Sequence, residues 1–299
     1  MNCPVCNNSN THIALESQDF SLTQASFSVV QCSKCSFRFT SPIPSQDEIG
    51  AFYKFTEYIS HTDTKEGWMN RLYHFVRNRT LTQKTNWIQS LFTGHKGHIL
   101  DIGAGTGAFA HAMHQKAWKV TGLEPDAVTR EKAYENYKLE LRSTDTIFDL
   151  PVNEFEVITM WHVLEHVHEL KPYLNQCFKS LKKNGRLIIA VPNYTSFDAK
   201  YYKKYWAAYD LPRHLYHFSP KAMTTLLKEM GFEIVSIRPM WYDSFYVSLL
   251  SEKYKQSGKL GLLIAGVIGM LSNIFAMKDA SKGSSIIYEF KKQSIPSIN

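Results

Sequence analysis

The sequence lacks the features that would place it outside ordinary globular proteins. Its 299 residues contain no run of five like charges, no fibrous repeat and no disordered composition. The start, Met1–Cys6, has no charged segment followed by an apolar stretch and a small-residue cleavage site. We therefore expect no secretory signal, a cytoplasmic protein, and one large α/β domain with a small appendage.

The charge balance gives little guidance about partners. There are 34 Lys and Arg against 27 Asp and Glu, with basic residues enriched over 71–84 and 200–221. This excess would suit an anionic partner, but an ordinary solvated surface explains the same count. A nucleic acid partner is not expected, and the oligomeric state cannot be read from the sequence.

Cysteine is scarce and unevenly placed. Four of the five cysteines form two CxxC pairs: Cys3, Cys6, Cys32 and Cys35. In a reducing compartment two such pairs predict a four-cysteine zinc site, whose closed shell suits a structural role. A redox pair or chance spacing are the alternatives, and His12 could replace one ligand. Cys177 lies on a predicted helix and is expected in the core.

The chain divides into three predicted regions. Residues 1–42 form a small zinc ribbon, 43–96 a helical connection that covers a ligand pocket, and 97–299 an α/β domain with an apolar helical insertion over 244–279. Strands and helices alternate in the last region, which indicates a mostly parallel sheet with helices on both faces. The expected strands are 98–102, 119–123, 139–142, 155–160, 186–191, 233–238 and 285–291. The expected helices reach Gln115 and cover 128–137, 170–181 and 223–230.

A glycine-rich turn follows the first of these strands. Asp101, Gly103, Ala104, Gly105 and Gly107 lie where a buried strand turns into a helix, so a ligand can approach the backbone closely. The second strand ends at Glu124, whose carboxylate can accept both hydroxyls of a ribose. A dinucleotide-binding fold uses the same elements, and the spacing alone does not exclude it because alanine can stand at the last motif position, here Ala108.

The turn and two later segments, 161–167 and 181–189, resemble class I S-adenosylmethionine-dependent methyltransferases of the methyltransferase domain family 23 type. The resemblance covers about 97–291 and implies a doubly wound, seven-stranded, mostly parallel sheet whose last strand is antiparallel. It implies S-adenosylmethionine as cofactor, with Asp101 and the backbone from Gly103 to Gly107 on the methionine and ribose. Glu124 would bind the ribose, Pro125 would flank the adenine, and Asp145 in the loop 144–147 would face it. Trp161 and His162 would border the sulfonium.

Two groups of polar residues are candidates for catalysis. Methyl transfer mainly requires alignment of the acceptor and, for a hydroxyl, removal of its proton. His162 and His166 are four residues apart and would share one helix face if a helix began at Trp161. The other group lies in 206–219, where we expect a role for Tyr209, Arg213 or His214, with His217 as a further candidate base. The alternative is that Asp210, Arg213 and His214 hold one another and fix the loop. Ser219-Pro220 predicts a helix start.

The acceptor is only partly indicated. The paired cysteines and the 206–219 segment look like methyltransferases of bacterial surface-glycan and sugar-biosynthesis clusters, and the segment after the fourth strand is similar to ubiquinone O-methyltransferases. This implies a small or lipid-linked acceptor with a sugar or phenolic hydroxyl. The alternative function is a zinc-ribbon protein that senses S-adenosylmethionine without catalysis.

One long apolar run lies near the end of the chain. Leu260–Met277 has no charged residue and is flanked by lysines. A span would place the last strand across a bilayer from its sheet, so we expect a lid or packing helix. In-plane contact of 260–277 with the inner face of a membrane is the second alternative.

Overall fold

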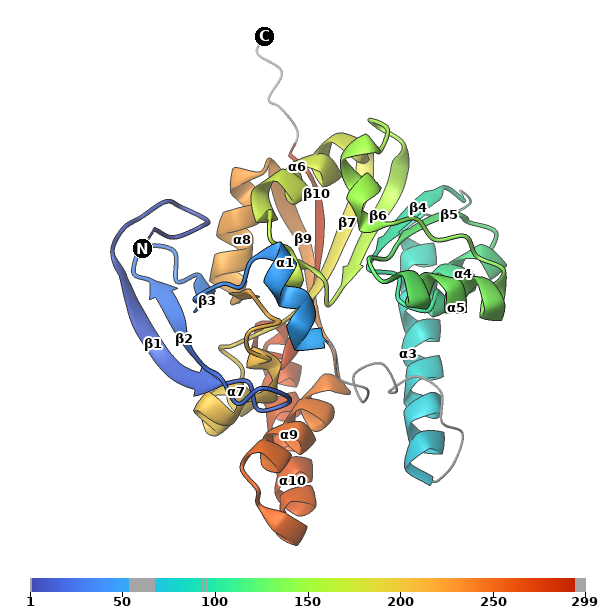
Figure 1. Ribbon diagram of the computed structural model, residues 1–299. Helices are drawn as coiled ribbons and strands as arrows, with labels where there is room; N and C mark the ends of the chain where they lie inside the picture. The colour runs from blue at the N-terminus through green and yellow to red at the C-terminus, as the bar shows by residue number, and fades with distance from the viewer. Residues whose placement is uncertain (1, 54–67, 93, 95, 294–299) are drawn as a thin grey trace. The chain divides into compact units, whose positions relative to one another are not determined.

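The computed structural model describes residues 2–53, 68–92, 94 and 96–293. The chain divides into two compact units that are each built from separate segments (Figure 1). The first unit comprises Met1–Tyr58, His162–Lys171 and Ile189–Phe290, and the second comprises Ile59–Trp161, Pro172–Ile188 and Lys291–Asn299.

The larger sheet has six strands in the described part of the chain, in the order β5-β4-β6-β7-β10-β9. Their bounds are β4 His98–Ile102, β5 Lys119–Leu123, β6 Phe155–Trp161, β7 Leu181–Pro192, β9 Phe232–Pro239 and β10 Ser285–Lys292. β4 is parallel to β5 and β6. β10 runs antiparallel to its neighbours, because its start bonds to the ends of β7 (Asn193 N to Ser284 O, 2.8 Å) and β9 (Met240 N to Ser285 O, 3.0 Å). The predicted doubly wound α/β class and antiparallel last strand are confirmed.

The strand predicted at 139–142, which would make the sheet seven-stranded, is not formed. Only an isolated parallel bridge joins Leu123 to Arg142. Two backbone hydrogen bonds hold it, from Glu124 N to Arg142 O and from Arg142 N to Gly122 O, both 2.9 Å. The segment therefore pairs at one residue, which is too short for a ladder.

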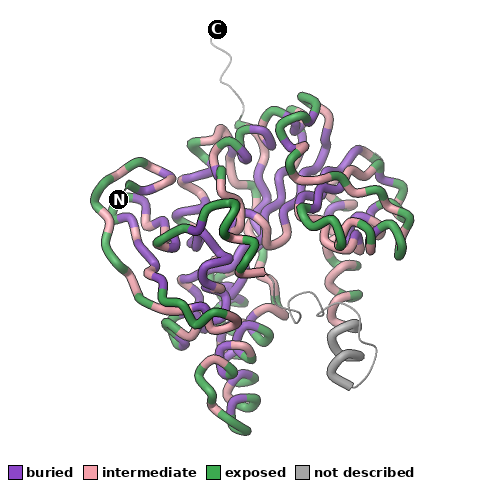
Figure 2. The backbone as a smooth tube through the Cα atoms, viewed as in Figure 1, coloured by how far each residue is buried: buried purple, intermediate pink, exposed green. Residues whose placement is uncertain are grey.

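The helices of the second unit follow the predicted alternation. They are α3 Trp68–Leu91, α4 Ala108–Gln115 and α5 Ala127–Tyr137, while α6 Leu170–Ser180 begins in the first unit. Every residue of β4 is buried, as expected for a central strand covered on both faces (Figure 2). Asp126 caps α5 by accepting the Thr129 N–H.

A smaller antiparallel sheet lies in the first unit. It consists of β1 Thr11–Gln18, β2 Ser26–Cys32, β3 Arg38–Ser41 and the short β8 Tyr216–His217. β3 pairs with β8 through Arg38 with His217 and Phe39 with Tyr216. The N-terminal strands therefore share a sheet with a segment almost 180 residues further along the chain.

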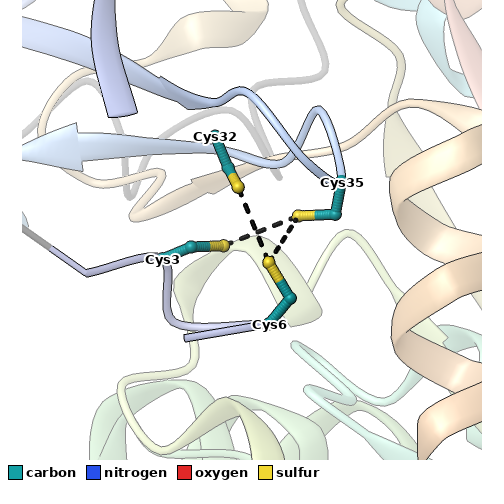
Figure 3. A group of neighbouring side chains, drawn as sticks. All are labelled: Cys3, Cys6, Cys32 and Cys35. Carbon is teal, nitrogen blue, oxygen red and sulfur yellow. Dashed lines mark hydrogen bonds between the residues drawn. The ribbon is translucent and has the colours of Figure 1, made fainter. Parts of the chain in front are cut away.

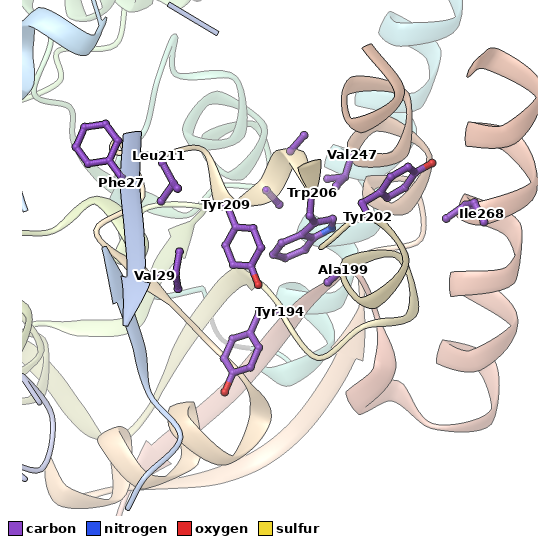
Figure 4. Close-up of a cluster of buried hydrophobic side chains, with 12 residues drawn as sticks. Phe27, Val29, Tyr194, Ala199, Tyr202, Trp206, Tyr209, Leu211, Val247 and Ile268 are labelled. Carbon is purple, nitrogen blue, oxygen red and sulfur yellow. The ribbon is translucent and has the colours of Figure 1, made fainter. Parts of the chain in front are cut away.

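An aromatic core joins this sheet to the C-terminal part of the first unit (Figure 4). Phe27 and Val29 of β2 belong to one buried cluster with Tyr194, Trp206 and Tyr209. The remaining helices of the unit are α1 Gln46–Ile49, α7 Phe197–Tyr202, α8 Pro220–Glu229, α9 Asp243–Tyr254 and α10 Gly261–Lys278. Ser219 caps α8 with Pro220 in its first turn, as predicted.

The apolar insertion forms a helical hairpin of α9 and α10. Gly269 allows the close approach, since a Cβ there would lie 2.6 Å from a ring carbon of Phe245. Ser272 of α10 donates to Asp198 at 2.7 Å, and Phe275 stacks on Phe197. The helix over Gly258–Lys278 is long and apolar enough to cross a membrane, but length and composition are the only criteria, and 33% of its 18-residue window is buried.

Candidate functional site

The glycine turn of the second unit has the backbone that only glycine adopts readily. Gly103, Gly105 and Gly107 have φ of 70°, 54° and 80°. Gly107 is the N-cap of α4, and a Cβ there would lie 3.2 Å from that of Ala133. Among the residues that the structure describes, a Cβ on Gly105 would meet nothing within 4 Å, which leaves this side of the turn open to a ligand.

Glu124 lies beside this turn, as predicted from its place at the end of β5. One carboxylate oxygen accepts the Gly105 N–H at 2.9 Å, and the other accepts the Asp126 N–H at 3.2 Å. Burial raises the pKa of Glu124, and these two N–H bonds oppose the rise. Pro125 follows on the surface, and Arg130 donates to the carbonyls of both residues at 2.7 Å.

Asp101 lies buried at the end of β4. It accepts the hydroxyl of Thr159 at 2.7 Å. Burial raises the pKa of Asp101 to about 7, although Thr159 and the charge of Lys84 act in the opposite direction. Sequence reasoning missed both Thr159 and Lys84, which no local motif marks.

Trp161 presents a ring face to a cation. The ammonium of Lys84 lies 3.9 Å from the ring centre, and the ring of Phe109 packs edge-on at 5.4 Å. The buried indole Nε1 has no hydrogen-bond acceptor among the described residues. A sulfonium could use this ring face only in place of the Lys84 ammonium, because two cations over one face repel each other. Asp145 is exposed in the 3-10 helix η2 Thr144–Asp149 and accepts the Ser143 hydroxyl at 2.8 Å.

His162 begins the polar cluster of the first unit. Its Nδ1 lies 3.2 Å from Glu165 Oε1 and its Nε2 3.0 Å from Asp243 Oδ2. Burial opposes protonation of this ring, but the two carboxylates outweigh it and raise the pKa of His162 to about 10. The ring is therefore protonated at neutral pH and cannot accept a proton from an acceptor hydroxyl.

The condition that a helix begins at Trp161 is not met. β6 extends through Trp161, His162 takes a positive φ of 56°, and the short 3-10 helix η3 spans Leu164–His166. His162 and His166 therefore do not share a helix face. His166 Nδ1 lies 3.0 Å from Arg213 O and 2.9 Å from Tyr53 Oη. Burial and the nearby His214 lower the pKa of His166 to about 4, so this ring is neutral at neutral pH.

Arg213 is buried among partners from its own unit. Its guanidinium donates to both oxygens of Asp210 at 2.7–3.1 Å, to Asp19 Oδ1 at 3.0 Å, to Phe52 O at 3.0 Å and to the Ser21 hydroxyl. With the side chain 2% exposed, these contacts support the alternative in which Arg213 fixes the loop.

The other loop residues are also held from within the unit. Tyr209 Oη accepts from Arg38 Nη1 at 2.9 Å, and His214 Nδ1 lies 2.9 Å from Ala208 O. His217 Nε2 lies 3.2 Å from Thr40 Oγ1. Asp19 was missed from the sequence, because it lies 194 residues before its partner Arg213.

The four N-terminal cysteines converge (Figure 3). The Sγ separations are 3.5 Å for Cys3–Cys35, 3.6 Å for Cys6–Cys32 and 3.5 Å for Cys6–Cys35, and all four Sγ atoms lie within 4.8 Å of one another. Zinc–sulfur bonds of about 2.3 Å in a tetrahedron place the sulfurs about 3.8 Å apart, so the donor set fits a structural Zn²⁺.

Comparison with known proteins identifies the family. Residues 73–237 match a family model described as "Methyltransferase domain". The ubiquinone biosynthesis O-methyltransferase of Haemophilus ducreyi is 32% identical over 122 residues, covering 37% of this chain and 52% of that protein. The same-named protein of Pseudomonas fluorescens Pf0-1 is 26% identical over 117 residues, covering 37% and 50%. The chain thus spans about half the length of these relatives.

A solved structure agrees in fold. A SAM-dependent methyltransferase from Archaeoglobus fulgidus superposes with a TM-score of 0.50 at 17% identity, covering 76% of this chain and all of that one.

Proposed function

Because the chain belongs to this methyltransferase domain family, we propose that it transfers a methyl group from S-adenosylmethionine to a hydroxyl of a small or lipid-linked acceptor, a sugar intermediate or a phenol. The observation that carries the proposal is the pairing of an open turn at Gly105 with the carboxylate of Glu124. Relatives named O-methyltransferases support a hydroxyl acceptor.

The residues of the second unit fit this cofactor. Glu124 offers a buried carboxylate for the ribose hydroxyls, and the backbone at Gly103–Gly107 can approach a ligand without side chains in the way. Asp101 provides a buried carboxylate for the positively charged methionine part, and the Trp161 ring can face its sulfonium once the Lys84 ammonium moves aside. When bound, S-adenosylmethionine supplies the methyl group of its sulfonium, and its sulfur is left as the neutral thioether of S-adenosylhomocysteine. The acceptor oxygen gains the methyl group and releases its proton to solvent.

Isothermal titration with S-adenosylhomocysteine tests cofactor binding. We expect wild type to bind, Gly105→Trp to lose binding because the indole fills the open side of the turn, and Glu124→Ala to bind more weakly. Glu140→Ala removes an exposed carboxylate and is the matched control. Absence of binding to a folded wild type would refute the proposal.

The acceptor can be found by transfer of label. Full-length protein is incubated with methyl-labelled S-adenosylmethionine and fractionated extracts of its source cell, and the labelled product is identified by mass spectrometry. A labelled sugar or phenol, absent with Glu124→Ala, is the expected result. Tight cofactor binding without label in any fraction would instead favour a non-catalytic S-adenosylmethionine sensor.

A further inference from the structure

In the first unit, three side chains of types that can bind a metal lie close together, apart from the four cysteines. One ligand atom each from Glu165, His166 and His214 lies within 4.8 Å of the other two. Glu165 is fully buried and His214 is 9% exposed. The two rings lie 4.6 Å apart, centre to centre.

The backbone fixes the protons of both rings. His166 Nδ1 faces the carbonyl of Arg213, and His214 Nδ1 faces the carbonyl of Ala208. A carbonyl oxygen only accepts, so it favours a proton on each Nδ1 and a lone pair on each Nε2. The Tyr53 hydroxyl, 2.9 Å from His166 Nδ1, fits this tautomer as a second acceptor. Metal-binding histidines are oriented in this way, with the second nitrogen donating to a backbone carbonyl or carboxylate.

One oxygen of the Glu165 carboxylate has no hydrogen-bond partner in the described part of the chain. Glu165 Oε1 is paired with His162, but the buried Oε2 has no hydrogen-bond partner among the residues that the structure describes. A buried carboxylate oxygen without a donor is costly, and neighbouring lone pairs repel it. A cation between them would satisfy all three groups.

We infer that Glu165, His166 and His214 bind a divalent transition metal ion, separate from the four-cysteine site. Two imidazoles and one carboxylate suit Zn²⁺ or Fe²⁺ better than Ca²⁺ or Mg²⁺, which prefer oxygen ligands. Asp210 Oδ2, 4.0 Å from His214 Nε2, would lie next to the ion. This inference does not depend on the proposed function.

Metal content and a cobalt spectrum test the site on the full-length protein. After removal of metal and reconstitution with Co²⁺ alone, we expect wild type to bind one ion more per chain than His214→Ala. The cysteine site should show intense thiolate-to-cobalt absorption, which Cys32→Ser removes, whereas the second site should show only weaker bands that His214→Ala removes. His114→Ala, at an exposed histidine, is the matched control.

Each outcome bears on the inference. If Glu165→Gln also loses the weaker bands and keeps its circular dichroism, the ligand set is supported. If wild type and His214→Ala hold the same amount of cobalt, the site is refuted.

A second observation, on the α9–α10 hairpin, points to a partner. α10 carries large exposed apolar side chains along its length, from Leu262 and Leu263 (63% and 68% exposed) to Met277 (75%). They recur at Val267, Met270 and Ile274, and α9 adds Phe245, Tyr246 and Leu249. A helix that is apolar on its exposed as well as its buried side is typical of a lipid environment.

Basic residues stand at both ends of this surface. Lys253, Lys255 and Lys259 lie at the turn of the hairpin, and Lys278 and Lys282 lie at its other end. α9 has only 12 residues, too few to cross a bilayer, and the hairpin leaves from β9 and returns to its neighbour β10. Both ends are therefore anchored in one sheet, which suits in-plane binding.

We also propose that the hairpin lies in the surface of an anionic membrane, with its apolar side in the acyl boundary and its lysines on the headgroups. In flotation, the full-length protein should bind vesicles of phosphatidylglycerol and phosphatidylcholine but not pure phosphatidylcholine. Leu263→Glu with Val267→Glu should abolish flotation, and Val128→Glu, at an exposed apolar residue elsewhere, should not. No flotation of wild type refutes the proposal. A dimer that the double variant dissociates, without flotation, would assign the surface to a second copy of the chain.

Discussion

Replacing Arg213 by methionine separates a structural from a substrate-binding role for this residue. The substitution removes the cation that Asp19 and Asp210 share and leaves Phe52 O without its donor. Breaking a buried ion pair on one side costs about 3–5 kcal/mol. Asp19 keeps the N–H bonds from Ser21, Leu22 and Thr23 at 2.9–3.2 Å, which still stabilise its charge. We therefore expect the free energy of unfolding to fall by about 3 kcal/mol, near the lower end of that range.

Urea denaturation of Arg213→Met against wild type measures this loss. Asp19→Asn with Arg213→Met should lose less than the sum of the two single variants, because the double variant leaves no unpaired charge at position 19. S-adenosylhomocysteine affinity should stay unchanged, since no hydrogen bond of Arg213 reaches 101–107. A stability loss below about 1 kcal/mol, together with abolished methyl transfer, would refute this reasoning and restore Arg213 as a substrate ligand.

Three further predictions follow from the same geometry. Gly107→Ala should lower the free energy of unfolding by about 1 kcal/mol and weaken S-adenosylhomocysteine binding, because Gly107 has a φ of 80°. Gly266→Ala, at a position on α10 with open space for a Cβ, should not destabilise the protein. Equal effects of the two variants in urea denaturation would contradict this. Since the folded pKa of His162, about 10, exceeds its ordinary 6.5, its stabilisation is complete below pH 6.5 and is lost toward pH 10. Wild type should therefore lose its advantage over His162→Gln across that interval, and a constant difference in denaturation midpoint would count against the charge. Chelation of zinc should expose residues 1–42 to proteolysis, as should Cys32→Ser but not Cys177→Ala, and unchanged cleavage would argue against a structural ion.

The parts of the fold that the sequence predicts well are those set by local pattern. β4 and β5 lie at their predicted bounds and α4 ends at Gln115 as predicted, because a buried strand, a glycine turn and an apolar helix face each leave a short-range signature. The cofactor turn is predictable for the same reason, since its glycines and Glu124 lie within one strand-helix-strand unit.

The parts that escaped prediction depend on pairing at long range. The segment near Leu139 alternates apolar and charged residues as a strand does, yet it pairs only through Arg142, because contact with a neighbouring backbone decides whether a ladder forms. Asp19 and Phe52 lie far along the chain from Arg213, and Glu165 approaches His214 from another loop, so the sequence revealed neither contact and predicted no metal site at Glu165. The sequence left open whether a helix begins at Trp161, because periodicity cannot show that β6 continues past Met160.

The pairing of β3 with β8 constrains how the protein can be made. A ribosome releases residues 38 and 39 long before 216 and 217, so the N-terminal sheet cannot be completed until most of the chain has been synthesised. During that interval Phe27 and Val29 lack the aromatic residues that later bury them. Zinc bound by the cysteines would bring the two CxxC pairs together early and protect this segment from aggregation while the rest of its unit is synthesised.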